Sequence, residues 1–149
     1  MKPYESPWMD DDLRMLREAV SRFVETEMLP QEPRWRAEHR VDYETWRAVG
    51  EAGFLLMDVP PEYGGGGGDF RHESVLYEEL ARRGISGFGQ GVHSIAAHYV
   101  LNYGTEQQKQ RWLPRMASGE LVGAIAMTEP GAGSDLKGIR TKAVRDGDH

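Results

Sequence analysis

A short apolar run near the carboxyl end, Leu121–Met127, limits the fold of this 149-residue chain more than any other stretch. It follows Gly119 and stops at Pro130. A run bounded in this way predicts a mostly buried strand that delivers a loop to one place. The loop, 131–134, is Gly-Ala-Gly-Ser. Glycines allow close approach to a ligand, and successive backbone N–H groups can converge on an anion.

Two familiar phosphate-binding loops do not match this stretch. A Walker A loop needs Lys and Ser or Thr after its second glycine, but Gly138 is followed by Ile139 and Arg140. The dinucleotide fingerprint G-x-G-x-x-G needs a glycine at 136, where the chain has Leu136. A glycine-rich hairpin connection is the simpler alternative, and spacing alone does not decide between it and a binding loop.

The identities of the residues in this stretch are more informative than the spacing of its glycines. Residues 126–135 read Ala-Met-Thr-Glu-Pro-Gly-Ala-Gly-Ser-Asp, and 138–142 read Gly-Ile-Arg-Thr-Lys. This resembles the flavin-binding signature of the acyl-CoA dehydrogenases. The resemblance implies that FAD is the cofactor and that Thr128 hydrogen-bonds the flavin near its N5–O4 edge. It also implies that Gly133 and Ser134 contact the FAD pyrophosphate, that Ser134 reaches the acyl-CoA, and that the flavin ring lies against Ile125, Ala126 and Met127.

The resemblance further implies a reaction, the α,β-dehydrogenation of a fatty acyl-CoA thioester. A carboxylate would remove the α-proton while the β-hydrogen leaves as hydride to the flavin. The family places that carboxylate in a carboxyl-terminal helical domain, so we assign no catalytic residue and expect the 149-residue chain alone to be inactive. The intact protein is expected to be a homotetramer that uses electron-transferring flavoprotein as its oxidant. The wording around 91–94 and 119–138 is most similar to long-chain members.

Two alternatives stay open at this point. One is an acyl-CoA oxidase or another flavin enzyme of the same superfamily, which would differ in the oxygen reactivity of its reduced flavin. The other is a non-enzymatic helical interaction module that kept the fold without the flavin. Neither is separated from a dehydrogenase by the residues alone.

Composition excludes several other classes of function. A formal net charge of −6 argues against a nucleic-acid-binding surface, and the absence of cysteine excludes disulfides and thiolate metal sites. His93 and His98 are five residues apart, which does not favour a shared metal on one helix face. No run approaches the roughly 18 apolar residues of a membrane span. Residues 1–8 lack the apolar core of a secretory signal, so we expect a cytoplasmic protein.

Four helix starts can be read from capping residues. The helices expected there begin after Asp10, Asp42, Asp69 and Thr105. Pro30 should end the first helix, and the last should stop near Leu113, with a short turn from Pro114. Trp35 and Trp46 are expected to pack in the core.

Two helices carry further expectations. On the third, we expect a solvated charged face, composed of Glu73, Glu78, Glu79, Arg82 and Arg83. The helix over 92–101 is apolar on most sides and should be buried centrally. The resemblance makes this helix a wall of the acyl tunnel, which would place Gln90, His93 and Ser94 beside the acyl chain. The alternative is that these polar residues only end a buried helix.

The remaining stretches complete the expected fold. Residues 64–68 are all glycine and are interpreted as a loop of extra mobility within one domain. Residues 139–145 alternate as a half-exposed strand does, and Asp146-Gly147 predicts a hairpin turn. The sequence therefore predicts a mainly α fold: an amino-terminal antiparallel helical bundle over 1–120, followed over 121–149 by the first strands of a truncated β-domain.

Overall fold

The structure is a computed structural model that describes residues 6–147. The expectation that no signal sequence is present rests partly on residues 1–5, which lie outside this range. The described residues contain six α-helices, which are α1 (Asp11–Phe23), α2 (Glu32–Glu38), α3 (Tyr43–Glu51), α4 (Phe70–Arg82), α5 (Gln90–Tyr103) and α6 (Glu106–Ala117). Four shorter helical turns are η1 (Val24–Met28), η2 (Leu29–Gln31), η3 (Pro61–Tyr63) and η4 (Leu136–Gly138). The mainly helical part of the prediction is confirmed.

All four predicted caps are confirmed. Asp10 and Asp42 each accept a hydrogen bond from the backbone N–H three residues ahead, at 2.9 and 2.8 Å. Asp69 caps α4, and Thr105 forms a capping box with Gln108. A cap satisfies a backbone donor that the helix itself leaves open, which is why these residues fix the helix starts.

Two predicted helix ends are wrong. The first helix does not stop at Pro30, because α1 passes through the π-helical turn η1 and the 3₁₀ turn η2 into α2. Pro30 and Pro33 sit in the first positions of η2 and α2, where a missing N–H removes no helical bond. Likewise α6 continues through Pro114 to Ala117. The carbonyl that loses its partner there belongs to the exposed Gln110, so water can satisfy it.

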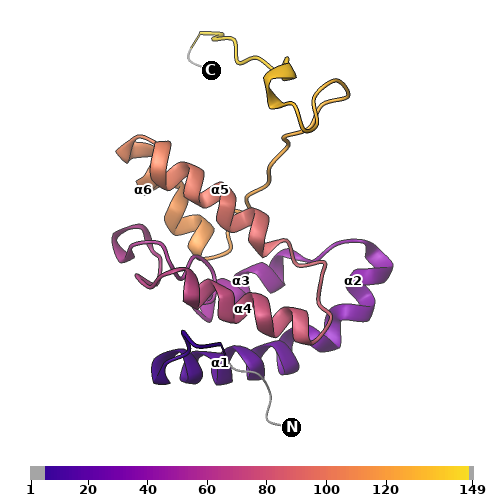
Figure 1. Ribbon diagram of the computed structural model, residues 1–149, viewed down its shortest axis with the longest axis vertical. Coiled ribbons are helices and arrows are strands. Elements are labelled where there is room, and N and C mark those ends of the chain that lie inside the picture. Colours follow the sequence, from indigo (N-terminus) through magenta and orange to yellow (C-terminus); the bar gives the residue numbers. More distant parts are fainter. Residues whose placement is uncertain (1–5, 148–149) are drawn as a thin grey trace.

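The helices pack in two groups, as Figure 1 shows. Helix α1 lies along α4 at one end of the molecule, and α5 pairs with α6 above them. Trp35 and Trp46 are buried in the larger core cluster, as predicted. A smaller cluster under α6 includes Leu56, Leu113 and Met116.

The glycine run is packed closely, which contradicts the extra mobility expected of it. The N–H groups of Gly66, Gly67 and Gly68 donate to the carbonyls of Leu56, Val59 and Met57. A Cβ placed on Gly65 would lie 2.1 Å from the Val59 carbonyl oxygen. The run therefore lets two stretches of backbone touch, a role that glycine fills because it has no side chain.

The side-chain environments of α4 and α5 differ from the prediction. Glu73 and Glu79 are buried, at 0% and 3% exposure, and are not part of a solvated face. On α5 the buried residues include Gln90, His93 and Ser94, while the exposed stripe is apolar, composed of Val92, Ile95, Tyr99 and Tyr103. Helix α5 is thus not central, because only one of its faces is covered by described residues.

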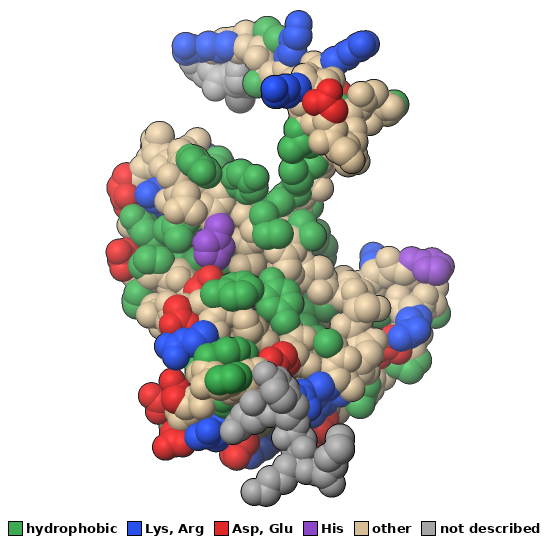
Figure 2. All heavy atoms as spheres, viewed as in Figure 1, with side chains coloured by type: hydrophobic (Ala, Val, Ile, Leu, Met, Phe, Trp, Pro, Cys, Tyr) green, Lys and Arg blue, Asp and Glu red, His purple; other side chains and the backbone are tan. Residues whose placement is uncertain are grey.

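The chain beyond α6 leaves the helices as an extended arm, residues 124–147 (Figure 1). Figure 2 shows this arm standing away from the helical part, with Lys and Arg side chains gathered at its far end. The predicted strands over 121–127 and 139–145 do not appear, and within residues 6–147 the only bridge is the isolated pair Glu129 and Ala132. An extended segment becomes a strand only when another segment pairs with it.

Candidate flavin-binding loop

The loop predicted to bind the flavin is closed at its base. Glu129 and Ala132 exchange backbone hydrogen bonds of 3.0 Å in both directions, which folds a tight turn around Pro130 and Gly131. The Glu129 carboxylate then accepts the backbone N–H groups of Arg140 and Thr141, each at 2.8 Å, and also the Thr141 hydroxyl. Residues 129–141 therefore form one closed unit.

The charge state of Glu129 supports this closure. The Thr141 hydroxyl, and then the two backbone N–H groups, lower the pKa of the Glu129 carboxyl below its usual value. These bonds favour the ionised form, which accepts hydrogen bonds at both oxygens. With both carboxylate oxygens engaged in these bonds, Glu129 holds the turn and is not free to act as a base.

The loop presents donors that nothing in the described chain uses. The N–H groups of Gly131, Gly133 and Ser134 make no hydrogen bond to another residue within 6–147, and neither do the hydroxyls of Thr128 and Ser134. All four residues are exposed, and a Cβ placed on Gly131 or Gly133 would meet no atom within 4 Å. Unused backbone N–H groups on an open, glycine-lined turn fit an anionic ligand such as a pyrophosphate.

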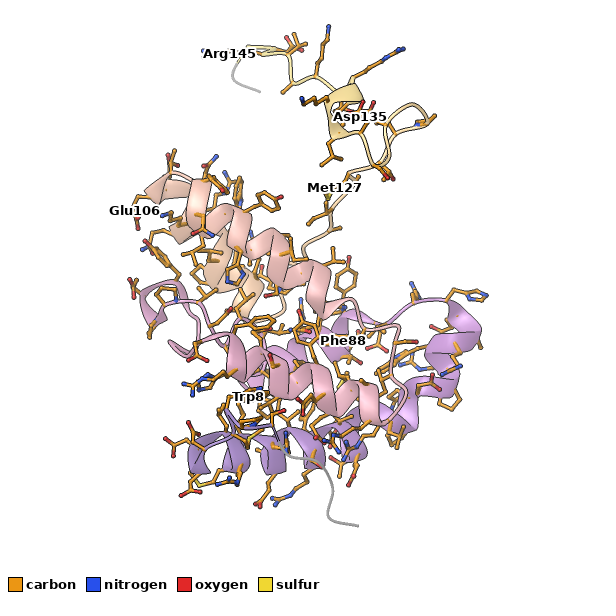
Figure 3. All side chains as sticks on the ribbon, viewed as in Figure 1. Trp8, Phe88, Glu106, Met127, Asp135 and Arg145 are labelled. Atoms are coloured by element: carbon orange, nitrogen blue, oxygen red, sulfur yellow. The ribbon has the colours of Figure 1, made fainter. Side chains whose placement is uncertain are left out.

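The stem before the loop carries the remaining flavin-site residues. Ile125 is half-buried, while Ala126 and Met127 are exposed. Figure 3 labels Met127 on this stem, with Asp135 and Arg145 farther along the arm. Residues 125–127 thus lie directly before the loop, at the start of the same arm.

The three residues predicted on the helical side, Gln90, His93 and Ser94, are all buried and lie away from the loop. His93 is fully buried and Ser94 is 6% exposed, both in the first turns of α5. His93 contacts the Met116 carbonyl through Nε2 at 3.1 Å and the Gly123 N–H through Nδ1 at 2.9 Å. Burial lowers the pKa of His93, although the Met116 carbonyl opposes this effect. Among described residues, no hydrogen bond joins His93 or Ser94 directly to the loop residues 128–134.

Sequence reasoning missed a buried polar cluster between α4 and α5. The Glu73 carboxylate accepts the Met57 N–H at 2.9 Å and a hydrogen bond from the Gln90 side chain. Burial, and then the nearby Asp58, raise the pKa of Glu73 to about 7. Asp58 itself pairs with His98 at 3.1 Å. The spacing of the charged residues along α4 could not predict that Glu73 is buried, because its burial depends on which segments pack against the helix.

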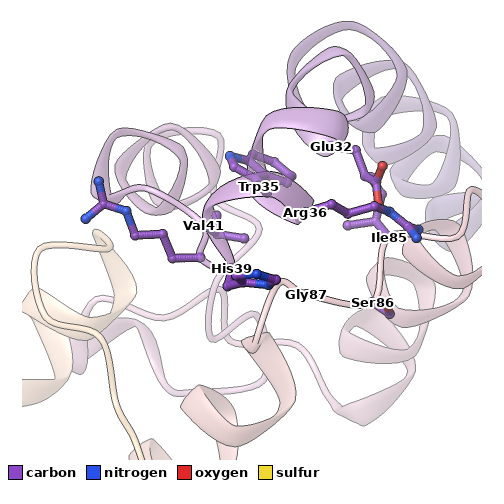
Figure 4. Close-up of a pocket in the computed structure, with 9 residues that line it drawn as sticks. Glu32, Trp35, Arg36, His39, Val41, Ile85, Ser86 and Gly87 are labelled. Atoms are coloured by element: carbon purple, nitrogen blue, oxygen red, sulfur yellow. The ribbon is translucent and has the colours of Figure 1, made fainter.

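A separate cavity of about 330 Å³ lies beside α2, as Figure 4 shows. Trp35, Val41 and Ile85 line it together with the polar residues Glu32, Arg36, His39, Arg40 and Ser86, and with Gly87. None of these residues belongs to the arm. Both Arg36 and Arg40 already pair with glutamates, Glu32 and Glu38. The cavity is therefore not part of the loop site.

Two other classes of site are absent from residues 6–147. No group of three or more His, Cys, Asp or Glu side chains is arranged there to hold a metal ion. No helix in this range combines the length and apolar character needed to cross a membrane.

Comparison with known proteins identifies the family of the helical part of the chain. Residues 10–120 match the family described as acyl-CoA dehydrogenase, N-terminal domain. The long-chain specific acyl-CoA dehydrogenase of Mus musculus mitochondria is 42% identical over 134 residues, which cover 89% of this chain and 31% of that protein. The chain therefore spans about a third of the length of such curated relatives.

Solved structures give the same result. An acyl-CoA dehydrogenase from Geobacillus kaustophilus superposes with a TM-score of 0.90 and 43% identity, covering 97% of this chain and 38% of that one. A glutaryl-CoA dehydrogenase from Mycobacterium smegmatis, in complex with FADH2, gives a TM-score of 0.84 and 33% identity, covering 93% of this chain and 36% of that one. The helical part of this chain is an acyl-CoA dehydrogenase amino-terminal domain, and the chain belongs to that family.

Proposed function

We propose that this chain supplies the flavin-binding loop and one helical wall of an FAD-dependent enzyme that dehydrogenates fatty acyl-CoA thioesters. The observation that carries the proposal is the exposed set of unused donors on the loop closed by Glu129. The family membership of residues 10–120 and the FADH2 complex of the M. smegmatis relative support it.

In this proposal the loop and the stem before it contact different parts of the FAD. The N–H groups of Gly133 and Ser134 bind the FAD pyrophosphate, while the Thr128 hydroxyl donates to the edge of the flavin ring. Ile125, Ala126 and Met127 cover one face of the ring and exclude water from it. Ser134 also contacts the acyl-CoA, and the start of α5, which carries His93 and Ser94, forms part of the helical wall beside the substrate.

Bound FAD would supply the hydride acceptor for the β-hydrogen of the substrate. The residues of this chain orient the flavin but offer no base for the α-proton, since Glu129 is engaged with Arg140 and Thr141. The base is proposed to come from sequence outside these 149 residues. Isolated, the chain should therefore show no turnover.

The remaining parts of the proposal concern the whole protein. They are a domain boundary near residue 120, electron-transferring flavoprotein as the oxidant, a homotetrameric assembly and a role in fatty acid β-oxidation. A cytoplasmic location is also only a prediction, because the mouse relative is mitochondrial.

The test uses the intact protein that contains this chain. After incubation with FAD and removal of excess, it should retain a flavin absorption band that bleaches on addition of a fatty acyl-CoA. Thr128→Val should weaken FAD binding by roughly fivefold or more, the effect of losing one hydrogen bond. Ser134→Ala keeps the backbone N–H and loses only the hydroxyl, so it should weaken acyl-CoA binding by a similar factor and leave FAD binding nearly unchanged. Ser86→Ala removes an exposed hydroxyl away from the arm and should leave binding unchanged. A protein that stays colourless with ample FAD would refute the proposal.

A further inference from the structure

The last hydrogen bonds between the helices and the chain leading into the arm are made by Leu121 and Gly123. Leu121 N–H donates to the Arg115 carbonyl at 2.9 Å, and two residues later Gly123 N–H donates to Nδ1 of His93 at 2.9 Å. Beyond Gly123, the hydrogen bonds of described residues join arm residues only to one another. The direction in which the chain leaves the helices is therefore set at His93 and Gly123.

The hydrogen-bond partners of His93 require one form of its ring. The Met116 carbonyl can only accept, so Nε2 must carry a proton. The Gly123 N–H can only donate, so Nδ1 must be unprotonated. The neutral ring with hydrogen on Nε2 satisfies both. It joins α5, the end of α6 and the start of the arm, and the Trp46 ring packs beside it at 5.1 Å.

The packing of Gly123 agrees with this role. A Cβ at Gly123 would lie 2.8 Å from the Cβ of Ala96 and 3.0 Å from Cε of Met116. Distances this short force neighbouring groups to move. The backbone at Gly123, just before the arm begins, thus lies directly against α5, and both the close contact and the His93 bond hold it there.

We infer that His93 is a positioning residue, whose Nδ1 fixes where the arm leaves the helices and thereby where the loop 128–134 lies. In this role it acts through Gly123 and not by touching a ligand. The consequence for flavin binding rests on the proposed function, but the anchor itself can be tested without flavin.

The two ring nitrogens can be tested separately by two substitutions in the 149-residue chain. His93→Asn keeps an acceptor close to the position of Nδ1 and loses the Nε2 donor, whereas His93→Gln keeps a donor near Nε2 and loses the Nδ1 acceptor. Both remove the ring, so each serves as the packing control for the other. Melting temperature and circular dichroism would verify that the helices still form.

The first readout is hydrogen exchange at the Gly123 amide, followed by nuclear magnetic resonance. His93→Gln should speed this exchange by roughly fivefold or more relative to His93→Asn, as expected for loss of one hydrogen bond. The second readout uses the absence of native cysteine. Spin labels on Gln107→Cys and Val144→Cys, both at exposed positions, should give a broader distance distribution with His93→Gln than with His93→Asn.

Equal exchange rates and equal distance distributions in the two variants would overturn the inference. If neither variant folds, Gly123→Ala tests the same contact without removing a buried ring. Gly123→Ala should broaden the distribution of distances between the labels at 107 and 144. Adding Ala96→Gly removes the methyl group that the new Cβ would meet, so the distribution should narrow again. An unchanged distribution in Gly123→Ala would equally overturn the inference. In the intact protein, flavin binding distinguishes the two proposals. Normal FAD binding by His93→Gln, despite a displaced arm, would refute the positioning role of His93 in flavin binding. A native protein that binds no FAD would instead refute the proposed function.

Discussion

The Glu129 carboxylate accepts both the backbone N–H of Thr141, at 2.8 Å, and the Thr141 hydroxyl. These two residues lie twelve positions apart, so the contact closes the whole loop that carries Gly133 and Ser134. The same carboxylate accepts the Arg140 N–H. One side chain thereby shapes a segment that has no strand partner within residues 6–147.

Replacing Glu129 with Gln should open this loop. The amide offers one acceptor oxygen where the carboxylate offered two, so the Arg140 or the Thr141 N–H loses its partner. Amide exchange at these positions should accelerate, while exchange in α1 and α4 stays the same. Thr141→Val removes only the hydroxyl and should have a smaller effect. Unaltered exchange at both amides in Glu129→Gln would show that the carboxylate does not close the loop.

The same closure should depend on pH. Because hydrogen bonds lower the pKa of Glu129 in the folded chain, its contribution is fully present above the usual value of 4.5. It is lost as the pH falls through the folded pKa, which lies below that value. The carboxyl carbon resonance of Glu129 should report this transition. A midpoint at or above 4.5 would contradict the assignment.

Glu73 should make stability depend on pH in the opposite sense. Its pKa is raised by burial, and then by Asp58, from 4.5 to about 7, so the folded chain binds this proton more tightly than the unfolded chain. The favourable contribution is complete below 4.5 and is lost as the pH rises through about 7. Over this range the chain should lose up to about 3 kcal/mol of stability.

Glu73→Gln tests this prediction, because Gln keeps an acceptor for the Met57 N–H and never ionises. Urea unfolding at pH 5 and pH 8 should give a flatter pH dependence for Glu73→Gln than for the native chain. Its stability should exceed that of the native chain at pH 8. Parallel pH profiles for the two proteins would argue against a buried, titrating Glu73.

Gly65→Ala should destabilise the chain. The new Cβ would lie 2.1 Å from the Val59 carbonyl oxygen, so the 64–68 turn must separate from the backbone of residues 56–59. A loss of about 2 kcal/mol is expected, in the range found for overpacked sites. Gly87→Ala is the matched control, since a Cβ there meets nothing within 4 Å and Gly87 caps no helix. The melting temperatures of the two variants would be compared by thermal unfolding. Equal values would mean that the 64–68 turn accommodates the extra methyl group without cost, contrary to the prediction.

Asp42→Ala should cost more than Asp10→Ala, although both remove a helix cap. Asp42 also accepts the Trp35 indole N–H at 3.0 Å and the Thr45 hydroxyl at 2.8 Å, and it pairs with Arg34. We expect losses of about 2–3 kcal/mol for Asp42→Ala and about 1 kcal/mol for Asp10→Ala. Asp42→Asn keeps the cap and should fall between the native chain and Asp42→Ala. Denaturant unfolding measures all three, and a cost for Asp42→Ala no larger than for Asp10→Ala would contradict the structure.

Local chemistry explains which features could be predicted. Asp10, Asp42 and Thr105 satisfy backbone donors only three residues away, so sequence spacing was enough to place their helix starts. The loop wording at 126–135 likewise carries the resemblance to the family within one short stretch. These features depend on residues that are close together in the sequence, so they can be recognised from the sequence of one chain.

Other features required the folded chain. Glu73 and Glu79 have the spacing of a solvated helix face, yet α1 and α5 cover them, because burial depends on which helix packs alongside. The run 64–68 looks flexible as sequence but touches the backbone of Val59. The extended run 121–127 could be read as a strand, but a ladder forms only with a second segment. The sequence by itself determined four helix starts and displayed the residues of the loop, since a cap needs only partners that lie two or three positions away in the chain. Only the tertiary structure decided which charges are buried and that His93 holds the arm at Gly123, because those depend on segments that meet across the fold.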